Sequence, residues 1–215
     1  HEPTVLRMSD TLFLRLRSLS PADEVECCVA DDTGVTAPER LPLAAVAPRA
    51  AGRRVVAFLP SAETLGITAA LPPMSAAKAR VALPYALEDQ LAGDLEEQHF
   101  AVGPRLADGR WPVRVIALAR LAAWLDLLRS AGLAPQALVA EADALRDKPG
   151  DLMLWLDGDD AHWRAPGHAP VTLPTDVLPE GAAAALGDLP QGTLGLRVHG
   201  RPEDLDRHGE ALSAV

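Results

Sequence analysis

Aromatic residues and long apolar runs are scarce in this 215-residue chain. Aromatic residues make up 4% of it although hydrophobic residues make up 48%, so the core is predicted to consist mainly of Leu, Val and Ala. No run approaches the roughly 18–20 apolar residues that a membrane-spanning helix needs, and no signal peptide is visible. The length suits one large domain or two small ones with a buried core.

Cysteine is almost absent, and the two cysteines present, Cys27 and Cys28, are adjacent. On a strand their side chains would point to opposite faces, so a disulfide between them would need a distorted backbone. Such a pair provides neither a disulfide framework nor a zinc site. We therefore expect two free thiols on a strand, in a reducing compartment.

Basic residues are also in the minority, with 20 Lys and Arg against 30 Asp and Glu and a formal net charge of -10. Arg53 and Arg54 form the only adjacent basic pair. This balance argues against binding to nucleic acid or to an anionic membrane surface. It favours a basic protein partner.

The apolar periodicity predicts an α/β layer architecture in which strands precede helices in both halves of the chain. Strands are expected at residues 11–17, 25–30, 53–60, 67–71, 98–102, 113–119, 138–139, 151–157, 161–165, 171–173 and 193–198. Helices are expected at residues 75–92, 118–131, 178–186 and 202–212. The second of these helices should bury Leu118, Leu121, Leu125 and Leu128 and end at Gly132.

Residues 72–103 hold the longest helical pattern and the densest run of carboxylates. Leucines recur there at positions i, i+4 and i+8: Leu83, Leu87 and Leu91. Pro84 lies inside the pattern and lacks an N–H, so the helix should kink or restart there at a cost of about 3 kcal/mol. Gly93 should end it, and Asp94 should cap a short turn through Glu97.

The acidic residues of this stretch are candidates for acid/base pairs or for a surface that binds a partner: Glu88, Asp89, Asp94, Glu96 and Glu97. No aromatic-lined sugar cleft accompanies them, which disfavours catalysis. Two interpretations stay open. The carboxylates either steer a basic partner or simply solvate the outer face of a helix whose leucines fill the core.

The segment Asp157-Gly158-Asp159-Asp160 is the candidate cofactor site. A strand that ends in Asp-Gly can present a carboxylate and backbone N–H groups to a phosphate or its Mg²⁺. The same residues also suit a type I′ hairpin turn. Because neither GxxxxGK[ST] nor GxGxxG occurs, the hairpin interpretation is preferred, and no cofactor is predicted.

Two further patterns suggest chemistry and are better explained by structure. His162 and His168 follow two aspartates, but their spacing matches no metal motif, so a surface loop without metal is expected. Ser75 and Lys78 match an SxxK nucleophile pair, yet the companion motifs of such acylating sites are missing. Ser75 is expected to cap a helix, and the chain is predicted not to be an enzyme.

Several of these segments together resemble one family. The segments are AKAR at residues 77–80, LPYALEDQLA at 83–92, Asp94-x-Glu96, and HFA at 99–101. With AGL at residues 131–133 and the Glu-Ala pair at 141–142, they resemble the cytoplasmic domain of the type II secretion system protein L. The order of elements agrees over almost the whole chain, whereas only the LPYALEDQLA…HFA block is specific.

The resemblance implies an actin-like ATPase superfamily fold, with two RNase H-like lobes of mixed sheets flanked by helices. Residues 1–71 would form the first lobe and 72–119 an inserted helix-hairpin subdomain. Residues 120–148 would return to the first lobe, and 149–215 would form the second.

The resemblance also implies a role. Such a protein would be a non-enzymatic scaffold that recruits the secretion ATPase (the E protein), through the ATPase's N-terminal domain, to the inner membrane. The chain would be the soluble cytoplasmic fragment of a single-pass membrane protein whose other parts contact the M protein, and it could form a homodimer. The alternative is a nucleotide-binding actin-like protein of the pilus-assembly type.

Overall fold

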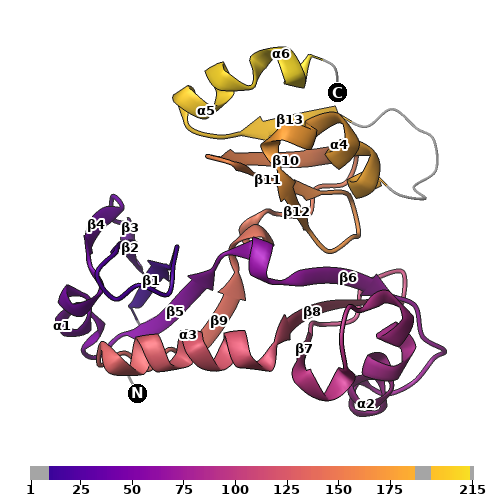
Figure 1. Cartoon of the computed structure of the whole chain (residues 1–215), viewed down its shortest axis with the longest axis horizontal. Helices are drawn as coiled ribbons and strands as arrows, with labels where there is room; N and C mark the ends of the chain where they lie inside the picture. The colour runs from indigo at the N-terminus through magenta and orange to yellow at the C-terminus, as the bar shows by residue number, and fades with distance from the viewer. Residues whose placement is uncertain (1–9, 187–194, 214–215) are drawn as a thin grey trace, which may run out of the picture. The chain divides into compact units, whose positions relative to one another are not determined.

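The structure is a computed structural model that describes residues 10–186 and 195–213. The chain divides into two compact units (Figure 1). The first comprises residues 1–60 and 119–141, and the second comprises residues 61–118 and 142–215. The division into four segments derived from the family resemblance stays a prediction.

The first unit is built on a mixed sheet with strand order β3-β2-β1-β5-β9, and β4 pairs with β2. Its strands are β1 (Thr11–Arg15), β2 (Glu24–Asp31), β3 (Gly34–Val35), β4 (Glu39–Pro42), β5 (Arg54–Leu59) and β9 (Ala137–Ala140). β1 pairs antiparallel with β2 and parallel with β5. Alternate residues on β1, Leu12 and Leu14, are fully buried, as the alternating sequence predicts.

The expected strand position of the two cysteines is confirmed. Both lie on β2 as free thiols, with Cys27 buried and Cys28 half-buried. Their side chains therefore point to opposite faces of the sheet. Burial raises the pKa of both thiols, so they stay protonated and weakly nucleophilic at neutral pH.

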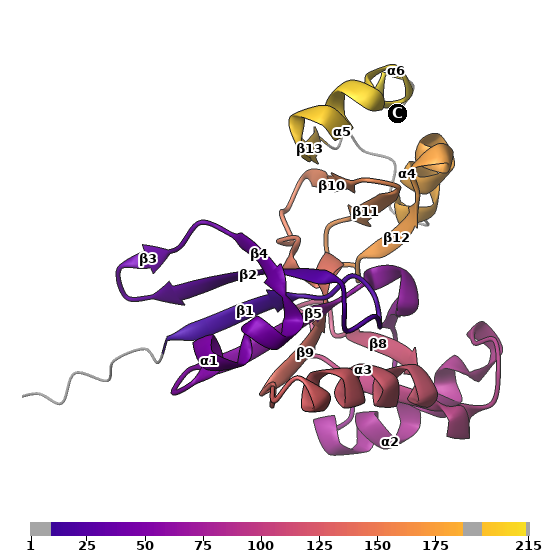
Figure 2. The same cartoon turned by 60° about the vertical axis from the view of Figure 1, so that its left-hand side comes forward.

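The helices of the first unit are η1 (Leu43–Ala45), α1 (Ala47–Ala50) and α3 (Leu118–Ser130). α3 begins at the boundary between the two units and lies along one face of the sheet (Figures 1 and 2). Its predicted buried face is partly wrong. Trp124 and Leu128 are its fully buried residues, whereas Leu118 is 43% exposed. The buried face therefore contains the large indole and not the first leucine.

The predicted end of α3 at Gly132 is confirmed. Gly132 has φ +74°, a conformation that glycine adopts without strain. The Leu133 N–H donates to the Leu128 carbonyl at 2.9 Å, and the Gly132 N–H donates to the Arg129 carbonyl at 3.0 Å. These two bonds form a Schellman motif.

The second unit contains an antiparallel sheet of order β6-β8-β7, covered by α2 (Figure 1). The elements are η2 (Ser61–Glu63), β6 (Leu65–Ala69), α2 (Ala76–Leu87), η3 (Glu88–Gln90), η4 (Leu95–Glu97), β7 (Gln98–Val102) and β8 (Trp111–Ala117). Three fully buried residues of α2 pack on this sheet: Ala79, Leu83 and Leu87. They lie against Trp111, Val113 and Val115 of β8.

Two expectations for α2 and the turn after it are wrong in part. The helix does not restart at Pro84 but continues to Leu87. Burying Leu83 and Leu87 contributes about 1.5–3 kcal/mol each, which outweighs the cost of an internal proline. The turn at Leu95–Glu97 does form, but the Asp94 side chain makes no capping bond. The turn is closed by the backbone, because the Glu97 N–H donates to the Asp94 carbonyl at 3.1 Å.

The second sheet of this unit has the order β12-β11-β10-β13. The elements are η5 (Glu141–Ala144, whose first residue belongs to the first unit), β10 (Asp151–Asp157), β11 (Asp160–Arg164), β12 (Val171–Pro174), η6 (Thr175–Val177), α4 (Leu178–Leu186), β13 (Gly195–His199), α5 (Pro202–Arg207) and α6 (Gly209–Leu212). Three antiparallel strands, a helix and a parallel strand follow one another here, as β1, β2, β4, α1 and β5 do in the first unit. The first residues of the strand predicted at 193–198 lie outside the described residues.

Arg110 joins the β7–β8 loop to the β11–β12 loop. Its guanidinium donates to Asp108 at 2.7 Å and to the Gly167 carbonyl at 3.0 Å, and it lies 3.0 Å from His168 Nε2. Because a guanidinium can only donate, His168 Nε2 accepts here, and its Nδ1–H donates to the Pro166 carbonyl at 2.9 Å. Arg110 thus binds the loop of the predicted Asp-Gly hairpin to the β11–β12 loop.

Asp108 should make the stability of the protein depend on pH. Hydrogen bonds from the Arg110 N–H and guanidinium lower the pKa of Asp108 from its ordinary value of 3.8. A carboxylate whose folded pKa is lowered stabilises the fold above the unfolded pKa and loses that contribution as pH falls through the folded pKa. In thermal unfolding, the melting temperature of Asp108→Asn should be lower than that of wild type at neutral pH. The two melting temperatures should converge as the pH falls below 3.8. A constant difference down to the lowest pH would contradict this assignment.

Within residues 10–186 and 195–213, no helix is long and apolar enough to cross a bilayer.

Candidate interaction surface

The predicted acidic residues lie in the segment that follows α2. Glu88 and Asp89 lie on η3, Asp94 precedes η4, and Glu96 and Glu97 lie on it. All five are exposed. The segment therefore presents carboxylates to solvent next to a packed helix. This exposure is consistent both with binding of a basic partner and with a merely solvated surface.

α2 itself has two different faces. Leu83 and Leu87 are at most 1% exposed, whereas Val81 and Tyr85 are 70% and 71% exposed. The exposed pair lies one helical turn apart, since residues four positions apart share a face. Sequence reasoning missed this pair, although its spacing of four residues outside the Leu83 and Leu87 stripe was visible as a signal.

The Ser75–Lys78 pair is a helix cap, as expected. Ser75 precedes α2 with extended backbone angles, and its Oγ accepts a hydrogen bond from the Lys78 N–H at 3.4 Å. The serine oxygen thus contacts the lysine backbone, the arrangement of an N-cap.

The candidate cofactor segment forms a tight hairpin, with Asp157 paired to Asp160 across β10 and β11. The expected type I′ turn is wrong, since Gly158 has φ +62° and none of the described non-glycine residues has a positive φ. A glycine first and a negative φ second are typical of a type II′ turn. The Thr175 N–H donates to the Asp159 carbonyl at 2.9 Å. A two-residue loop held in this way is much shorter than the glycine-rich loops that wrap a phosphate.

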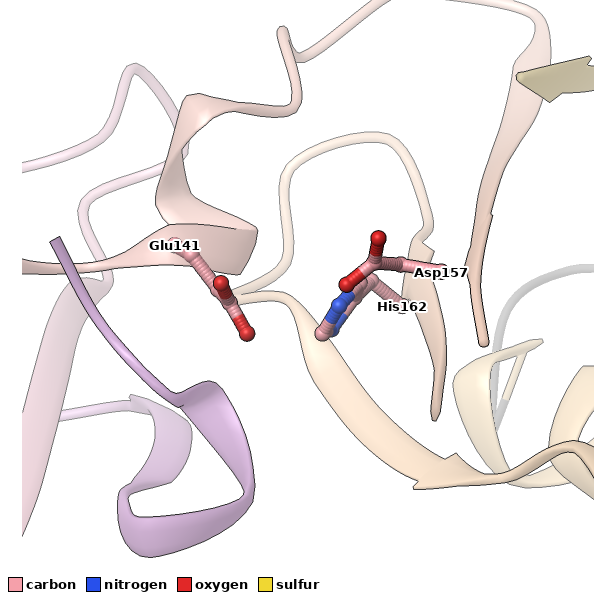
Figure 3. A group of neighbouring side chains, drawn as sticks. All are labelled: Glu141, Asp157 and His162. Atoms are coloured by element: carbon pink, nitrogen blue, oxygen red, sulfur yellow. The ribbon is translucent and has the colours of Figure 1, made fainter. Parts of the chain in front are cut away.

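The expected surface position of His162 is also wrong. His162 lies on β11 next to Asp157 at the end of β10 (Figure 3), and it is fully buried. Its ring packs on Trp155 with centroids 4.6 Å apart, and Nδ1 lies 2.9 Å from Thr172 Oγ1. Strand alternation places His162 on the opposite face of β11 from the core residues Ala161 and Trp163, where Trp155 and Thr172 contact it. His168, by contrast, lies in the β11–β12 loop, as predicted.

The first unit contains an ion-pair network that sequence reasoning missed. Glu141, which begins η5 (Figure 3), is 2% exposed and accepts a hydrogen bond from Arg15 Nε at 2.7 Å. Arg15 also lies 3.5 Å from Glu26, which pairs with Arg40 at 2.7 Å. The partners are up to 126 positions apart in the chain, so no local pattern could reveal them.

A shallow hollow of about 180 Å³ lies beside this network on the same sheet. Phe13 and Phe58 stack there with centroids 6.0 Å apart, and Cys28, the cross-strand neighbour of Phe13 on β2, also lines the hollow. Since the lining is mostly apolar and the Cys28 thiol is protonated, this hollow is suited to packing and not to nucleophilic chemistry.

Comparison with known proteins identifies the family. Residues 12–185 match the family described as type II secretion system (T2SS), protein L. The protein L of Pseudomonas aeruginosa is 42% identical over 100 residues, covering 46% of this chain and 26% of that protein. The protein L of Dickeya chrysanthemi is 33% identical over 88 residues, covering 41% and 22%. The matched region thus spans about a quarter of the length of these relatives.

Solved structures share the fold. The cytoplasmic domain of EpsL, an inner membrane component of the type II secretion system of Vibrio cholerae, matches with a TM-score of 0.75 at 22% identity, covering 90% of this chain and 83% of that one. A Bacteroides thetaiotaomicron protein with an actin-like ATPase fold matches with a TM-score of 0.53 at 12% identity, covering 95% and 87%. The predicted mixed α/β, actin-like fold is confirmed. The chain belongs to the type II secretion system protein L family.

Proposed function

We propose that this chain is a non-enzymatic scaffold of the type II secretion system that recruits the secretion ATPase to the inner membrane. Its family membership supports a place in the secretion machinery, and the related EpsL is an inner membrane component with a cytoplasmic domain. In this proposal the chain lies on the cytoplasmic face, and parts of the whole protein outside this chain contact the M protein.

The exposed acidic segment at residues 88–97 is the candidate binding surface in this proposal. Its five exposed carboxylates follow in the chain a helix whose other face is anchored in the core. A rigid acidic surface attracts a basic partner and increases the rate of encounter. We assign this surface to the N-terminal domain of the ATPase.

The direct test is co-elution of this chain with the purified N-terminal domain of the cognate ATPase on a sizing column. We expect a complex at tens of micromolar protein, which corresponds to about −6 kcal/mol of binding free energy. Separate elution at that concentration would overturn the proposed function.

Neutralising four of the acidic residues tests the surface. The variant combines Glu88→Gln, Glu97→Gln, Asp89→Asn and Asp94→Asn. Because it removes the attraction to a basic partner, binding should weaken about tenfold and lose most of its dependence on salt.

A matched control removes the same charge elsewhere, at four exposed positions: Asp32→Asn, Asp176→Asn, Glu203→Gln and Glu210→Gln. The control should bind like wild type. Equal weakening in both variants would show that net charge, and not this surface, determines binding.

A further inference from the structure

β7 is an edge strand that nothing in its own sequence protects from pairing. It ends the sheet of order β6-β8-β7 (Figure 1). Edge strands of natural proteins commonly carry a proline or a charged side chain that keeps other strands away. The sequence of β7, QHFAV, contains no proline, Asp, Glu, Lys or Arg. Its outer edge is therefore suited to pairing with a further strand.

The register of β7 on β8 identifies the backbone groups that point outward. The Gly103 N–H, one residue past β7, donates to the carbonyl of the β8 residue opposite to it at 2.9 Å. Bonded and non-bonded pairs alternate along an antiparallel ladder, so the N–H and carbonyl groups of Ala101 and His99 face β8. Those of Val102 and Phe100 face away from it. Among the described residues, no backbone carbonyl outside the sheet accepts from these two N–H groups.

The side chains of β7 hold this edge in place. Phe100 and Val102 pack against the buried cluster that α2 forms with β8. His99 and Ala101 are exposed on the other face of the strand. Because the strand is already ordered, a partner that pairs with it does not bear the entropic cost of ordering it.

β6, the strand at the opposite edge of the sheet, is contacted by the β11–β12 loop. Thr68 Oγ1 of β6 accepts from the Ala169 N–H at 2.7 Å. The Pro170 carbonyl lies so close to Gly66 that no side chain fits there. The two edge strands thus differ, and β7 is the one that we consider for pairing.

The acidic segment at residues 88–97 leads directly into β7. Glu96 and Glu97 are exposed, and Glu97 immediately precedes Gln98, the first residue of the strand. A strand added along β7 would pass these carboxylates at one end. The complementary partner is therefore an extended segment with basic side chains at that end.

We propose that β7 is the docking edge for an extended basic segment of the ATPase's N-terminal domain, which adds a strand to this sheet. In such an addition, main-chain hydrogen bonds provide affinity, here through Phe100 and Val102. Glu96 and Glu97 attract the basic end of the segment and so determine its direction. This inference rests on the proposed function, since it names how the same partner binds.

Residue-resolved amide hydrogen exchange tests the proposal, on the 215-residue chain alone and with the purified N-terminal domain of the cognate ATPase. In the chain alone, the amides of Phe100 and Val102 should exchange fast and those of His99 and Ala101 slowly. In the complex, exchange at Phe100 and Val102 should slow about tenfold or more, with little change at the other two. A contact through side chains would not select every second amide.

Val102→Pro tests the edge by substitution. Proline removes an outward N–H and places its ring in the path of the added strand, whereas the bonds from β7 to β8 remain. The Kd for the ATPase domain should rise about tenfold or more. Val102→Ala is the matched control, because it shortens the same side chain and keeps the N–H. It should bind like wild type.

The outcomes separate this inference from the proposed function. Co-elution without slower exchange at Phe100 and Val102 would overturn the inference alone, and so would equal weakening by Val102→Pro and Val102→Ala. Separate elution of the two wild-type proteins would overturn the proposed function and this inference with it. If exchange at these two amides slowed in the chain alone as its concentration rose, a second copy would occupy the edge, and the assignment to the ATPase would be wrong.

Discussion

Replacing Trp124 with alanine is expected to lower the free energy of unfolding by about 3–5 kcal/mol, as removal of a large core aromatic typically does. Trp124 is fully buried on α3 and is among the largest buried side chains of the protein. Its removal costs the transfer free energy of the indole and leaves a cavity, because close-packed neighbours relax only partly. Chemical denaturation monitored by circular dichroism measures the loss.

Leu118→Ala is the matched control on the same helix. Leu118 is 43% exposed, so its truncation should change the unfolding free energy by about 0.5 kcal/mol or less. The leucine pattern of the sequence predicts the opposite, with Leu118 buried. A large effect of Leu118→Ala and a small effect of Trp124→Ala would refute the orientation of α3 described above.

Glu141→Ala should be nearly as damaging, with a loss of about 3 kcal/mol. The Glu141 side chain is 3% exposed and that of Arg15 is 14% exposed. Removing the carboxylate takes away the 2.7 Å partner of the mostly buried guanidinium, which also lies 3.5 Å from Glu26. A buried charge that loses its closest counter-ion retains the desolvation penalty without the compensating attraction.

The double replacement Arg15→Met with Glu141→Leu separates the desolvation penalty of the two charges from their mutual attraction. Removing both charges together eliminates the desolvation penalty, so the double variant should be more stable than Glu141→Ala. Arg40→Ala serves as the surface control: the Arg40 side chain is 58% exposed, and its loss should destabilise the protein far less than Glu141→Ala does. A double variant less stable than Glu141→Ala would mean that the pair contributes net stabilisation.

Local signals carried most of the secondary structure. Some signals act over only a few residues, so they can be recognised in the sequence. Examples are the alternating leucines of β1, the serine before α2, the glycine after α3 and the Asp-Gly turns. The LPYALEDQLA…HFA block likewise points to the family through residues that are close together in the chain.

The predictions from sequence were wrong where contacts with residues distant in the chain decide which side chains are buried and where a helix continues. On α3, Trp124 is buried and Leu118 is exposed, because tertiary packing determines which side of the helix is covered. His162 contacts side chains of the two neighbouring strands, Trp155 and Thr172, and Pro84 is tolerated because Leu83 and Leu87 are anchored in the core.

The sequence by itself determined the order of strands and helices, the acidic character of residues 88–97 and the family. Only the tertiary structure decided that Glu141 pairs with Arg15 and that Val81 and Tyr85 face solvent beside those carboxylates. The physical reason is that burial and ion pairing depend on neighbours brought together by folding, whereas turns, caps and periodicity depend on neighbours along the chain.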